Sequence, residues 1–382
     1  LCRTRTALNV RRYRSTDAAG VTALYRAAFP AAVPPGWDEP RFARHWDEHP
    51  AGPAGREDIG PLVLAAPGGA VAGFLGVHPR PLIWRGRTVW GAVCSDLCVA
   101  ASARGFGGAI LLSAFLEGPQ DFSFSDEGNE SAFALWTALG GSVVWLESLR
   151  WTLPLRPARL ALSALLRRHS GPALYGTLSA ATVPFDALAR ALMSIPTPQP
   201  APGQVLEPLQ PCSLLDARRR LGFNWPLAAG DDESSLSWKL NRLACFRQAG
   251  SLRAFLVRSR QASPAGWFIY YLRPRGLSDV IEVAGRPADL PAVFDSLLHD
   301  AWAARASGLT GRFEPHLAGI LGRRFCLTQP NPRWMLVASR IPDLLNDVLA
   351  GRAWLTRLDG EWIHHLPAVD SPQPKGLPNE PN

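Results

Sequence analysis

The sequence contains very little lysine and methionine. Lys239 and Lys375 are the only lysines among 40 basic residues, and there are two methionines in 382 residues. Abundant arginine, alanine, glycine and proline beside this scarcity are typical of codon bias in a GC-rich bacterial genome. The formal net charge of +8 therefore says little alone about a partner, although it is compatible with an anionic one such as a phosphate group.

Patterns that the sequence lacks disfavour three classes of protein. The six cysteines include no CxxC pair, and Cys94 and Cys98 have no nearby histidine, which argues against a zinc site. No apolar run reaches about 18–20 residues without an arginine or proline, so no membrane span is expected. No basic stripe interleaved with aromatic residues is present, so no nucleic-acid partner is expected. We therefore expect a cytoplasmic protein with reduced cysteines and no metal.

The length predicts two domains, at the usual scale of about 100–200 residues each. Residues 8–157 alternate strand-like and helix-like patterns, and residues 212–366 repeat that order of elements with different residues. Between them, residues 158–211 read as a helical connector that ends in a proline-rich linker. Its first helix, flanked by arginines, packs between domains or lies on a membrane surface. The final stretch, 367–382, is predicted to be a disordered tail.

Turn and cap residues divide the first half into elements. Three strands are predicted within residues 61–100, with turns at residues 67–69 and near residues 85–86. A helix opens on the following glycines, and a second helix covers residues 129–141 and stops at a glycine pair. Residues 142–153 are predicted to form the closing strand of this half, so the first half alone should complete one sheet.

The sharpest local signal is a glycine-rich stretch at residues 99–109. It follows a predicted strand and opens a helix, with glycine at 105, 107 and 108. Glycines let backbone N–H groups turn toward one cavity, and the helix N-terminus adds partial positive charge. Such a loop can hold a pyrophosphate. At this level, a tight turn without any ligand remains an open alternative.

Two motifs that follow one another help to decide between a phosphate-binding loop and a simple turn. Residues 104–109, RGFGGA, resemble the R/Q-x-x-G-x-G/A motif of the GNAT N-acyltransferase superfamily, and residues 94–103 look like its fourth strand. Residues 129–141, NESAFALWTALGG, are similar to the superfamily's second motif, N-x-x-A-x-x-L-Y-x-x-L-G-F. The resemblance covers about residues 8–155 and extends to residues 212–365 only through the order of elements.

The resemblance implies an α/β protein with two GNAT-like domains in tandem and acyl-CoA, most simply acetyl-CoA, as co-substrate. The acceptor would be a small-molecule amine, such as an aminosugar or a secondary metabolite, and it would attack the thioester directly. The pantetheine arm would lie between two diverging strands. The residues implied to bind CoA are Cys98, Val99, Ala100, Arg104, Gly105, Phe106, Gly107, Gly108, Ala109, Asn129 and Trp136.

Catalytic groups are less evident than the CoA motif. The superfamily's frequent tyrosine acid falls at Trp136, and an indole cannot protonate a thiolate. The candidate bases are Asp96 on the fourth strand and Asp126 or Glu127 beside the divergence. Each acid could instead be solvated, or cap the helix that starts near residue 129. His78, on a strand end, is either structural or faces the acceptor.

The second half is expected to be a degenerate GNAT-like domain. In the turn that corresponds to the phosphate loop, Pro287 removes a donor and Asp289 opposes phosphate charge. Residues 311–316 and 357–362 group charges with aromatic residues, which predicts either domain packing or the lining of an acceptor cleft. Two alternatives to an acyl-CoA enzyme stay open: a FemABX-like transferase that uses charged tRNA, and a non-catalytic CoA-binding protein.

Overall fold

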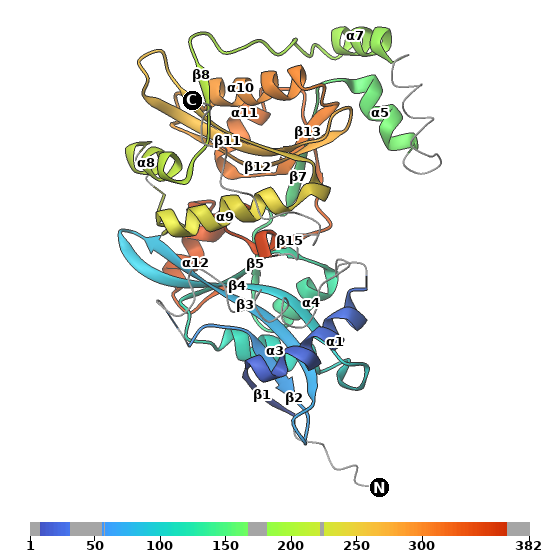
Figure 1. The fold of residues 1–382 in the computed structure, drawn as a ribbon, viewed down its shortest axis with the longest axis vertical. Coiled ribbons are helices and arrows are strands. Elements are labelled where there is room, and N and C mark those ends of the chain that lie inside the picture. Colours follow the sequence, from blue (N-terminus) through green and yellow to red (C-terminus); the bar gives the residue numbers. More distant parts are fainter. Residues whose placement is uncertain (1–7, 31–55, 57, 167–181, 222–224, 365–382) are drawn as a thin grey trace, which may run out of the picture. The chain divides into compact units, whose positions relative to one another are not determined.

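The computed structural model describes residues 8–30, 56, 58–166, 182–221 and 225–364. The chain divides into two compact units, each built around one mixed sheet (Figure 1). The first unit comprises Leu1–Trp145, Trp225–Cys245 and Pro332–Asn382, and the second comprises Leu146–Asn224 and Phe246–Asn331. Two mixed sheets with helices confirm the predicted α/β fold class. The predicted tail at 367–382 lies outside the described residues.

The first unit contains a nine-stranded sheet in which β4 and β5 are parallel neighbours. The main order is β1-β2-β3-β4-β5-β15-β6, and β9 joins β3 and β16. Its strands are β1 (Asn9–Arg12), β2 (Leu62–Ala65), β3 (Val71–Trp84), β4 (Arg87–Val99), β5 (Phe122–Gly128), β6 (Ser142–Val143), β9 (Leu227–Ala229), β15 (Trp334–Ser339) and β16 (Ala353–Trp354). Its helices are η1 (Ser15–Asp17), α1 (Ala18–Ala28), η2 (Ala101–Ala103), α3 (Gly107–Leu116), α4 (Glu130–Ala138), α9 (Glu233–Cys245), α12 (Pro342–Leu349) and η5 (Glu361–His364).

Both predicted turns of the first sheet are confirmed. Arg85 and Gly86 have φ values of +50° and +78° and join β3 to β4 in a two-residue hairpin. Left-handed residues at both central positions match the twist of the flanking strands. Gly68 and Gly69 also have positive φ and connect β2 to β3. The residues of these turns therefore set the register of the β2–β3 and β3–β4 hairpins.

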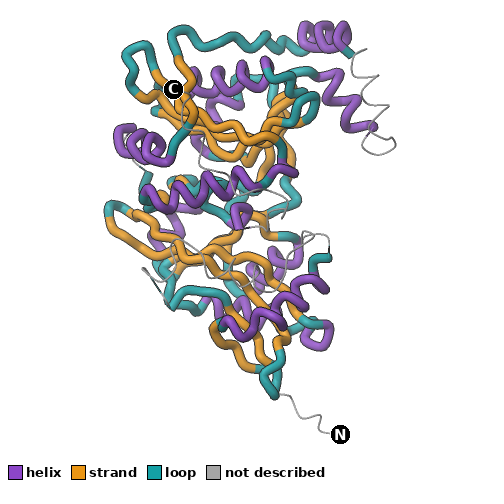
Figure 2. Tube along the Cα trace, in the orientation of Figure 1, coloured by secondary structure: helices purple, strands orange, loops and turns teal. Residues whose placement is uncertain are grey.

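Helices pack on both faces of the first sheet. Figure 2 shows the helices in purple and the strands in orange. One face packs against α3 and α4, through residues that include Leu75, Ala92, Cys94, Leu111 and Trp136. The other packs against α1 through Val21, Tyr25, Phe74 and Cys98. Phe74 and Leu75 are adjacent in β3 and so point to opposite faces. The sheet thus has an α3/α4 face and an α1 face.

Four strands, one from residues 8–157 and three from residues 212–366, lie in the sheet of the other half; β9 and β16 are two of them. The predicted closing strand 142–153 is divided: β6 stays in the first sheet, and β7 (Leu149–Pro154) pairs with β13 (Gly308–Arg312) in the second. In exchange, β15 comes from the C-terminal part of the chain and pairs with β5. The prediction that the first half completes its own sheet was therefore wrong. Both β7 and β15 have buried apolar residues, which do not specify the sheet they join.

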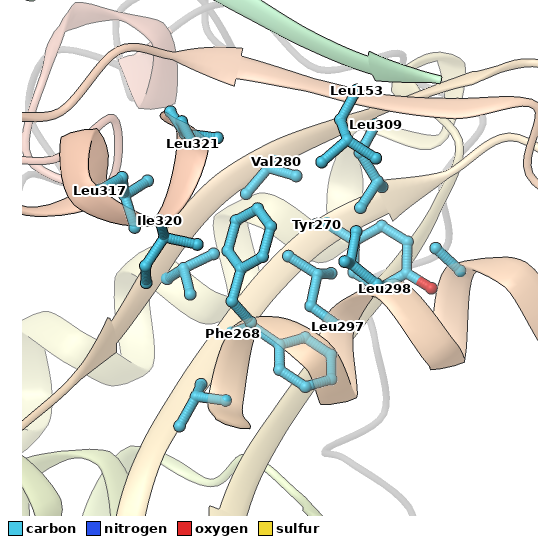
Figure 3. Packing of buried hydrophobic residues seen from close by; sticks show 14 of the residues in the cluster. Leu153, Phe268, Tyr270, Val280, Leu297, Leu298, Leu309, Leu317, Ile320 and Leu321 are labelled. Atoms are coloured by element: carbon cyan, nitrogen blue, oxygen red, sulfur yellow. The ribbon is translucent and has the colours of Figure 1, made fainter. Parts of the chain in front are cut away.

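The second unit has a seven-stranded sheet in the order β14-β7-β13-β12-β11-β10-β8. Its other strands are β8 (Val205–Pro208), β10 (Ser251–Arg258), β11 (Pro264–Leu272), β12 (Leu277–Gly285) and β14 (Leu327–Pro330). Its helices are α5 (Pro157–Leu166), α7 (Val183–Leu192), α8 (Pro211–Leu221), η3 (Arg247–Ala249), α10 (Leu290–Ala303), η4 (Pro315–Leu317) and α11 (Ala318–Leu321). Figure 3 shows Phe268 and Tyr270 of β11 packed among leucines of α10, in the core of this unit. Among the described helices, none is long and apolar enough to cross a membrane.

Candidate functional site

Strands β4 and β5 of the first unit pair along only part of their length. The parallel pairing runs from Gly91 opposite Phe122 to Val93 opposite Phe124, although β4 continues to Val99 and β5 to Gly128. Beyond Val93 and Phe124 the two strands are no longer bonded to each other. The unpaired edges leave backbone groups available between the strands, as the GNAT resemblance implied.

A β-bulge in β4 places Asp96 at this divergence. Gly76 lies opposite Ser95 and Phe74 opposite Cys98, so β4 holds one residue more than β3 across this step. Asp96 has a φ of +52°, in the left-handed region. Its Oδ1 accepts a hydrogen bond of 3.0 Å from the hydroxyl of Tyr25 on α1. The bulge thus turns a partly exposed carboxylate toward the α1 face.

The predicted cradle lies directly after β4. Arg104 donates its backbone N–H to Ala101 O at 3.4 Å, and Ile110 donates to Phe106 O at 3.0 Å. Between them, the N–H groups of residues 105–109 meet no acceptor in the part of the chain that the structure describes. They precede the first intrahelical bond of α3, where the helix dipole is positive. This group of donors suits a pyrophosphate.

The glycines of this loop serve different purposes. Gly105 has a φ of +92° and open space around its Cα, so the loop is not covered by protein there. A Cβ on Gly107 would lie 3.1–3.2 Å from Ala103, Leu64 and Val99. Gly107 therefore lets α3 approach the strands closely, whereas Gly105 supplies the turn that exposes the donors.

Of the three strand residues implied to bind pantetheine, Val99 is the best placed. Ala100 donates its N–H to Ala72 O at 2.8 Å, and its carbonyl accepts from Ala103 at 2.9 Å, so both of its backbone groups are engaged. Cys98, two residues earlier in the same antiparallel ladder, faces β3 as well. The backbone groups of Val99 alternate with these and face away from β3. The expectation for Ala100 is therefore wrong, and Cys98 is oriented unfavourably.

Two further residues implied to bind CoA have structural roles. Asn129 is the N-cap of α4, and its side chain accepts a hydrogen bond from Ala132 N at 2.9 Å. Trp136 is 1% exposed and packs edge-on against Phe115 on the α3/α4 face. Its indole fills the core and is not open to a ligand, so the expected cofactor contact from Trp136 is wrong. Asn129 is therefore the cap of this helix, and neither Asp126 nor Glu127 caps it.

The carboxylates of β5 lie beside a segment from the far end of the chain. We call residues 356–364 the C-terminal turn. Asp126 is buried, and its Oδ1 accepts a 2.6 Å hydrogen bond from the backbone N–H of Glu361. A Cβ on Gly360 would lie 2.0 Å from Asp126 Oδ2, so only glycine permits this approach. Glu127 lies 3.8 Å from Arg333 and 3.9 Å from Arg357.

Glu361 is the site residue that the sequence analysis missed. Its Oε2 lies 2.6 Å from Ser125 Oγ, and η5 contacts both β4 and β5. Desolvation raises the pKa of Glu361 well above its usual range, and the charges of Asp126 and Asp96 raise it further. In the sequence, residues 357–362 group charges with aromatic residues. The structure places this segment in the first unit, beside the diverging strands.

Buried charges hold the C-terminal turn in place. Lys239 of α9 is 0% exposed, and its Nζ lies 2.7 Å from Asp359 Oδ1 and 2.6 Å from Asp231 Oδ1. Arg80 of β3 donates from Nε to Asp359 O at 3.1 Å. His364 stacks on His78 with 3.5 Å between ring centroids. His78 is thus a buried structural residue of the first unit.

The cysteines near the divergence are not suited to form an acyl-enzyme. Cys94 and Cys98 are both buried, and burial raises the pKa of each thiol above its usual range. A neutral buried thiol is a poor nucleophile. Among the described residues, no group of three or more His, Cys, Asp or Glu side chains is arranged to hold a metal ion.

In the described part of the second unit, the turn between β12 and α10 does not form an equivalent cradle. In the turn between β12 and α10, Asp289 and Leu290 donate their N–H groups to Arg286 O, and Ala292 and Val293 donate to Asp289 O. Arg286 also forms an ion pair of 2.7 Å with Asp289. The donors that would bind a phosphate are therefore already used within the turn. This matches the expectation of a degenerate second domain.

Comparisons with known proteins identify the fold. No protein-family model and no curated protein sequence matches this sequence. Among solved structures, a "probable N-acyltransferase" from Enterococcus faecalis superposes with a TM-score of 0.57 at 10% identity, over 87% of this chain and 72% of that one. GCN5-related N-acetyltransferases from Anabaena variabilis (TM-score 0.54, 14% identity, 86% and 72% coverage) and Kribbella flavida (0.53, 14%, 86% and 70%) are similar. The chain has the fold of the GCN5-related N-acetyltransferases, as its two motifs predicted.

Proposed function

We propose that the first unit binds an acyl-CoA, most simply acetyl-CoA, and transfers its acyl group to the amine of a small molecule. One observation carries this proposal: a row of unpaired backbone donors at residues 105–109 directly follows the strand that diverges from β5. A pyrophosphate at the donors and a pantetheine arm along Val99 would use both features at once. The N-acetyltransferases among the structural neighbours support the choice of acetyl.

In this reaction the protein positions two reactants and handles one proton. The loop at residues 104–109 would hold the CoA phosphates, with the exposed Arg104 guanidinium as a further cation. The acceptor nitrogen would attack the thioester carbon, and the bond from carbon to sulfur would then break. A carboxylate must take the proton from nitrogen. Of the three carboxylates predicted from sequence, Asp126 is buried, Glu127 lies within 4 Å of two arginines, and Asp96 is partly exposed and accepts a hydrogen bond from Tyr25.

Calorimetry with acetyl-CoA tests the proposal on the wild type and on two matched variants. Arg104→Glu reverses an exposed charge at the loop, and Arg87→Glu reverses an exposed charge at the β3–β4 hairpin. We expect Arg104→Glu to weaken binding about tenfold or more, since a charged hydrogen bond contributes about 1.5–3 kcal/mol. Arg87→Glu should bind like the wild type. S-acetyl-pantetheine, which lacks the pyrophosphate, should bind both variants equally weakly.

Turnover separates this function from its alternatives. Release of free thiol from acetyl-CoA in the presence of a panel of primary amines would support the transferase. Tight binding of acetyl-CoA without turnover on any amine would instead support a non-catalytic CoA-binding protein. Absence of binding to the wild type would contradict the proposal and leave the tRNA-dependent alternative to be tested with charged tRNA.

A further inference from the structure

The C-terminal turn brings a carboxyl group to the diverging strands from more than two hundred residues away. The hydrogen bond from Glu361 N to Asp126 Oδ1 spans 235 residues in sequence. The contacts of η5 with β4 and β5 lie on the strands that the proposed function assigns to the thioester. Glu361 is therefore the acidic residue that the fold delivers to this place from outside the motifs.

The carboxyl of Glu361 is held in one position by its own neighbours. Its Oε2 pairs with Ser125 Oγ at 2.6 Å, while its backbone N–H binds Asp126. Asp126 is thus a positioning residue, because its carboxylate is used to fix the Glu361 backbone. Glu361 is partly exposed as a residue, whereas Asp126 is buried, and the Glu361 carboxyl lies at the strands that diverge.

The titratable and polar groups that face Glu361 from its neighbouring elements are Tyr25 of α1, Cys94 and Asp96 of β4, and Ser125, Asp126 and Glu127 of β5. Cations also lie along the C-terminal turn: Lys239 of α9 binds Asp359 and Asp231, Arg242 of α9 donates to Ile363 O, Arg80 of β3 donates to Asp359 O, and Arg357 lies near Glu127. Burial and these carboxylates raise the pKa of Glu361, so its carboxyl holds a proton more firmly than a solvated glutamate does.

We propose that Glu361 is the residue that moves the proton in acyl transfer, an inference that rests on the proposed function. As the acceptor nitrogen bonds to the thioester carbon, the Glu361 carboxylate takes one proton from that nitrogen. As the bond from carbon to sulfur breaks, the same carboxyl returns the proton to the leaving thiolate. Nitrogen loses one proton, sulfur gains it, and Glu361 ends in its starting form. Glu361 thereby also acts as the acid, a role that a tyrosine often has in the superfamily and that Trp136 cannot perform.

The test compares Glu361→Gln, Glu361→Asp and the control Glu233→Gln, in which an exposed glutamate of α9 is changed. The acceptor probe is hydroxylamine, a small nucleophile that requires no specific acceptor recognition. We expect kcat of Glu361→Gln to fall about 10²–10⁴-fold while the Kd for acetyl-CoA stays unchanged. The rise of kcat/KM with pH should disappear in Glu361→Gln and persist in Glu361→Asp. Glu233→Gln should match the wild type.

A second measurement does not depend on turnover. In protein carrying ¹³C-labelled glutamate, the infrared carboxyl band that Glu361→Gln removes belongs to Glu361. Acetyl-CoA should shift the pH at which this band titrates, because the thioester would lie against it. Gln is close in shape to a protonated Glu and can still pair with Ser125, so the variant should fold; circular dichroism checks this.

The outcomes separate this inference from the proposed function. If the wild type fails to bind acetyl-CoA, the proposed function falls and this inference falls with it. If acetyl-CoA binds and is turned over but Glu361→Gln keeps kcat within about threefold, only the role of Glu361 is overturned. An unmoved carboxyl band on binding acetyl-CoA would overturn it as well.

Discussion

The Nζ of Lys239 lies 2.7 Å from Oδ1 of Asp359, which precedes the Gly360–Glu361 pair at the diverging strands. Lys239 is fully buried and also binds Asp231. A buried ammonium between two carboxylates is stabilised only by those partners, and each carboxylate depends on the ammonium in turn. In a sequence with two lysines and 40 basic residues, this lysine joins α9 to the C-terminal turn within the first unit.

Replacing Lys239 with methionine should lower the free energy of unfolding by about 3–5 kcal/mol, because the change leaves two buried carboxylates facing each other. Denaturant unfolding monitored by circular dichroism measures the effect. The triple variant Lys239→Met, Asp231→Asn, Asp359→Asn removes both charges as well and should recover part of the loss. A loss below about 1 kcal/mol in the single variant would show that the triad is not holding the turn.

The sequence predicted the glycine-rich turn between β4 and α3 because its determinants are local. The glycine pattern at residues 105–108, the preceding strand and the following helix all lie within one short stretch, and backbone conformation there depends on the residues themselves. The turns at residues 67–69 and 85–86 were predicted for the same reason. Motif order then identified the fold.

Features that depend on distant pairing were not predicted. The exchange of β7 and β15 between sheets leaves each strand's own pattern unchanged, so no local signal distinguishes the two topologies. Glu361 contacts Asp126, which lies 235 residues earlier in the sequence, and no local pattern in either segment indicates that contact. The motif places Trp136 at the ligand, but a motif position carries no information about burial. The tryptophan at a position normally held by tyrosine is the sequence feature that indicates a core residue here.

The glycines of the loop between β4 and α3 should respond differently to alanine. In Gly107→Ala the new Cβ would lie 3.1–3.2 Å from Ala103, Leu64 and Val99, which is too close for a packed core. We expect a loss of about 1–3 kcal/mol in unfolding free energy. In Gly108→Ala the Cβ meets Leu135 at 3.4 Å, an ordinary contact. That variant should match or exceed wild-type stability in the same denaturant experiment, and equal losses in both would contradict the packing argument.

Asp17 should stabilise the protein at neutral pH and lose this effect in acid. Its carboxylate accepts two hydrogen bonds of 2.6 Å from Arg11, and these lower the pKa of Asp17. A depressed pKa means that the folded chain releases the proton more readily than the unfolded one. The contribution is therefore present above the ordinary Asp value of about 3.9 and is lost as pH falls through the lowered value.

The variant Asp17→Asn should accordingly cost about 1.5–3 kcal/mol near pH 7, as expected for bonds to a charged partner, and far less near pH 2. Denaturant unfolding across this range measures the difference. Asp58→Asn removes an exposed partner of Arg56 and should leave stability close to that of the wild type at every pH. An Asp17→Asn effect that does not change with pH would point to packing rather than charge.

Glu361 should have the opposite influence on stability. Desolvation and the nearby charge of Asp126 raise its pKa in the folded protein, so the folded chain holds the proton more tightly than the unfolded chain. The stabilising effect is complete below the ordinary Glu value of about 4.3 and is lost as pH rises through the raised value. Glu361→Gln cannot ionise, so its stability relative to the wild type should increase as pH rises from the ordinary Glu value through the raised value, and then stay constant. Denaturant unfolding at several pH values measures this without any acceptor or CoA. A constant difference between the two proteins would mean that folding does not raise the pKa of Glu361.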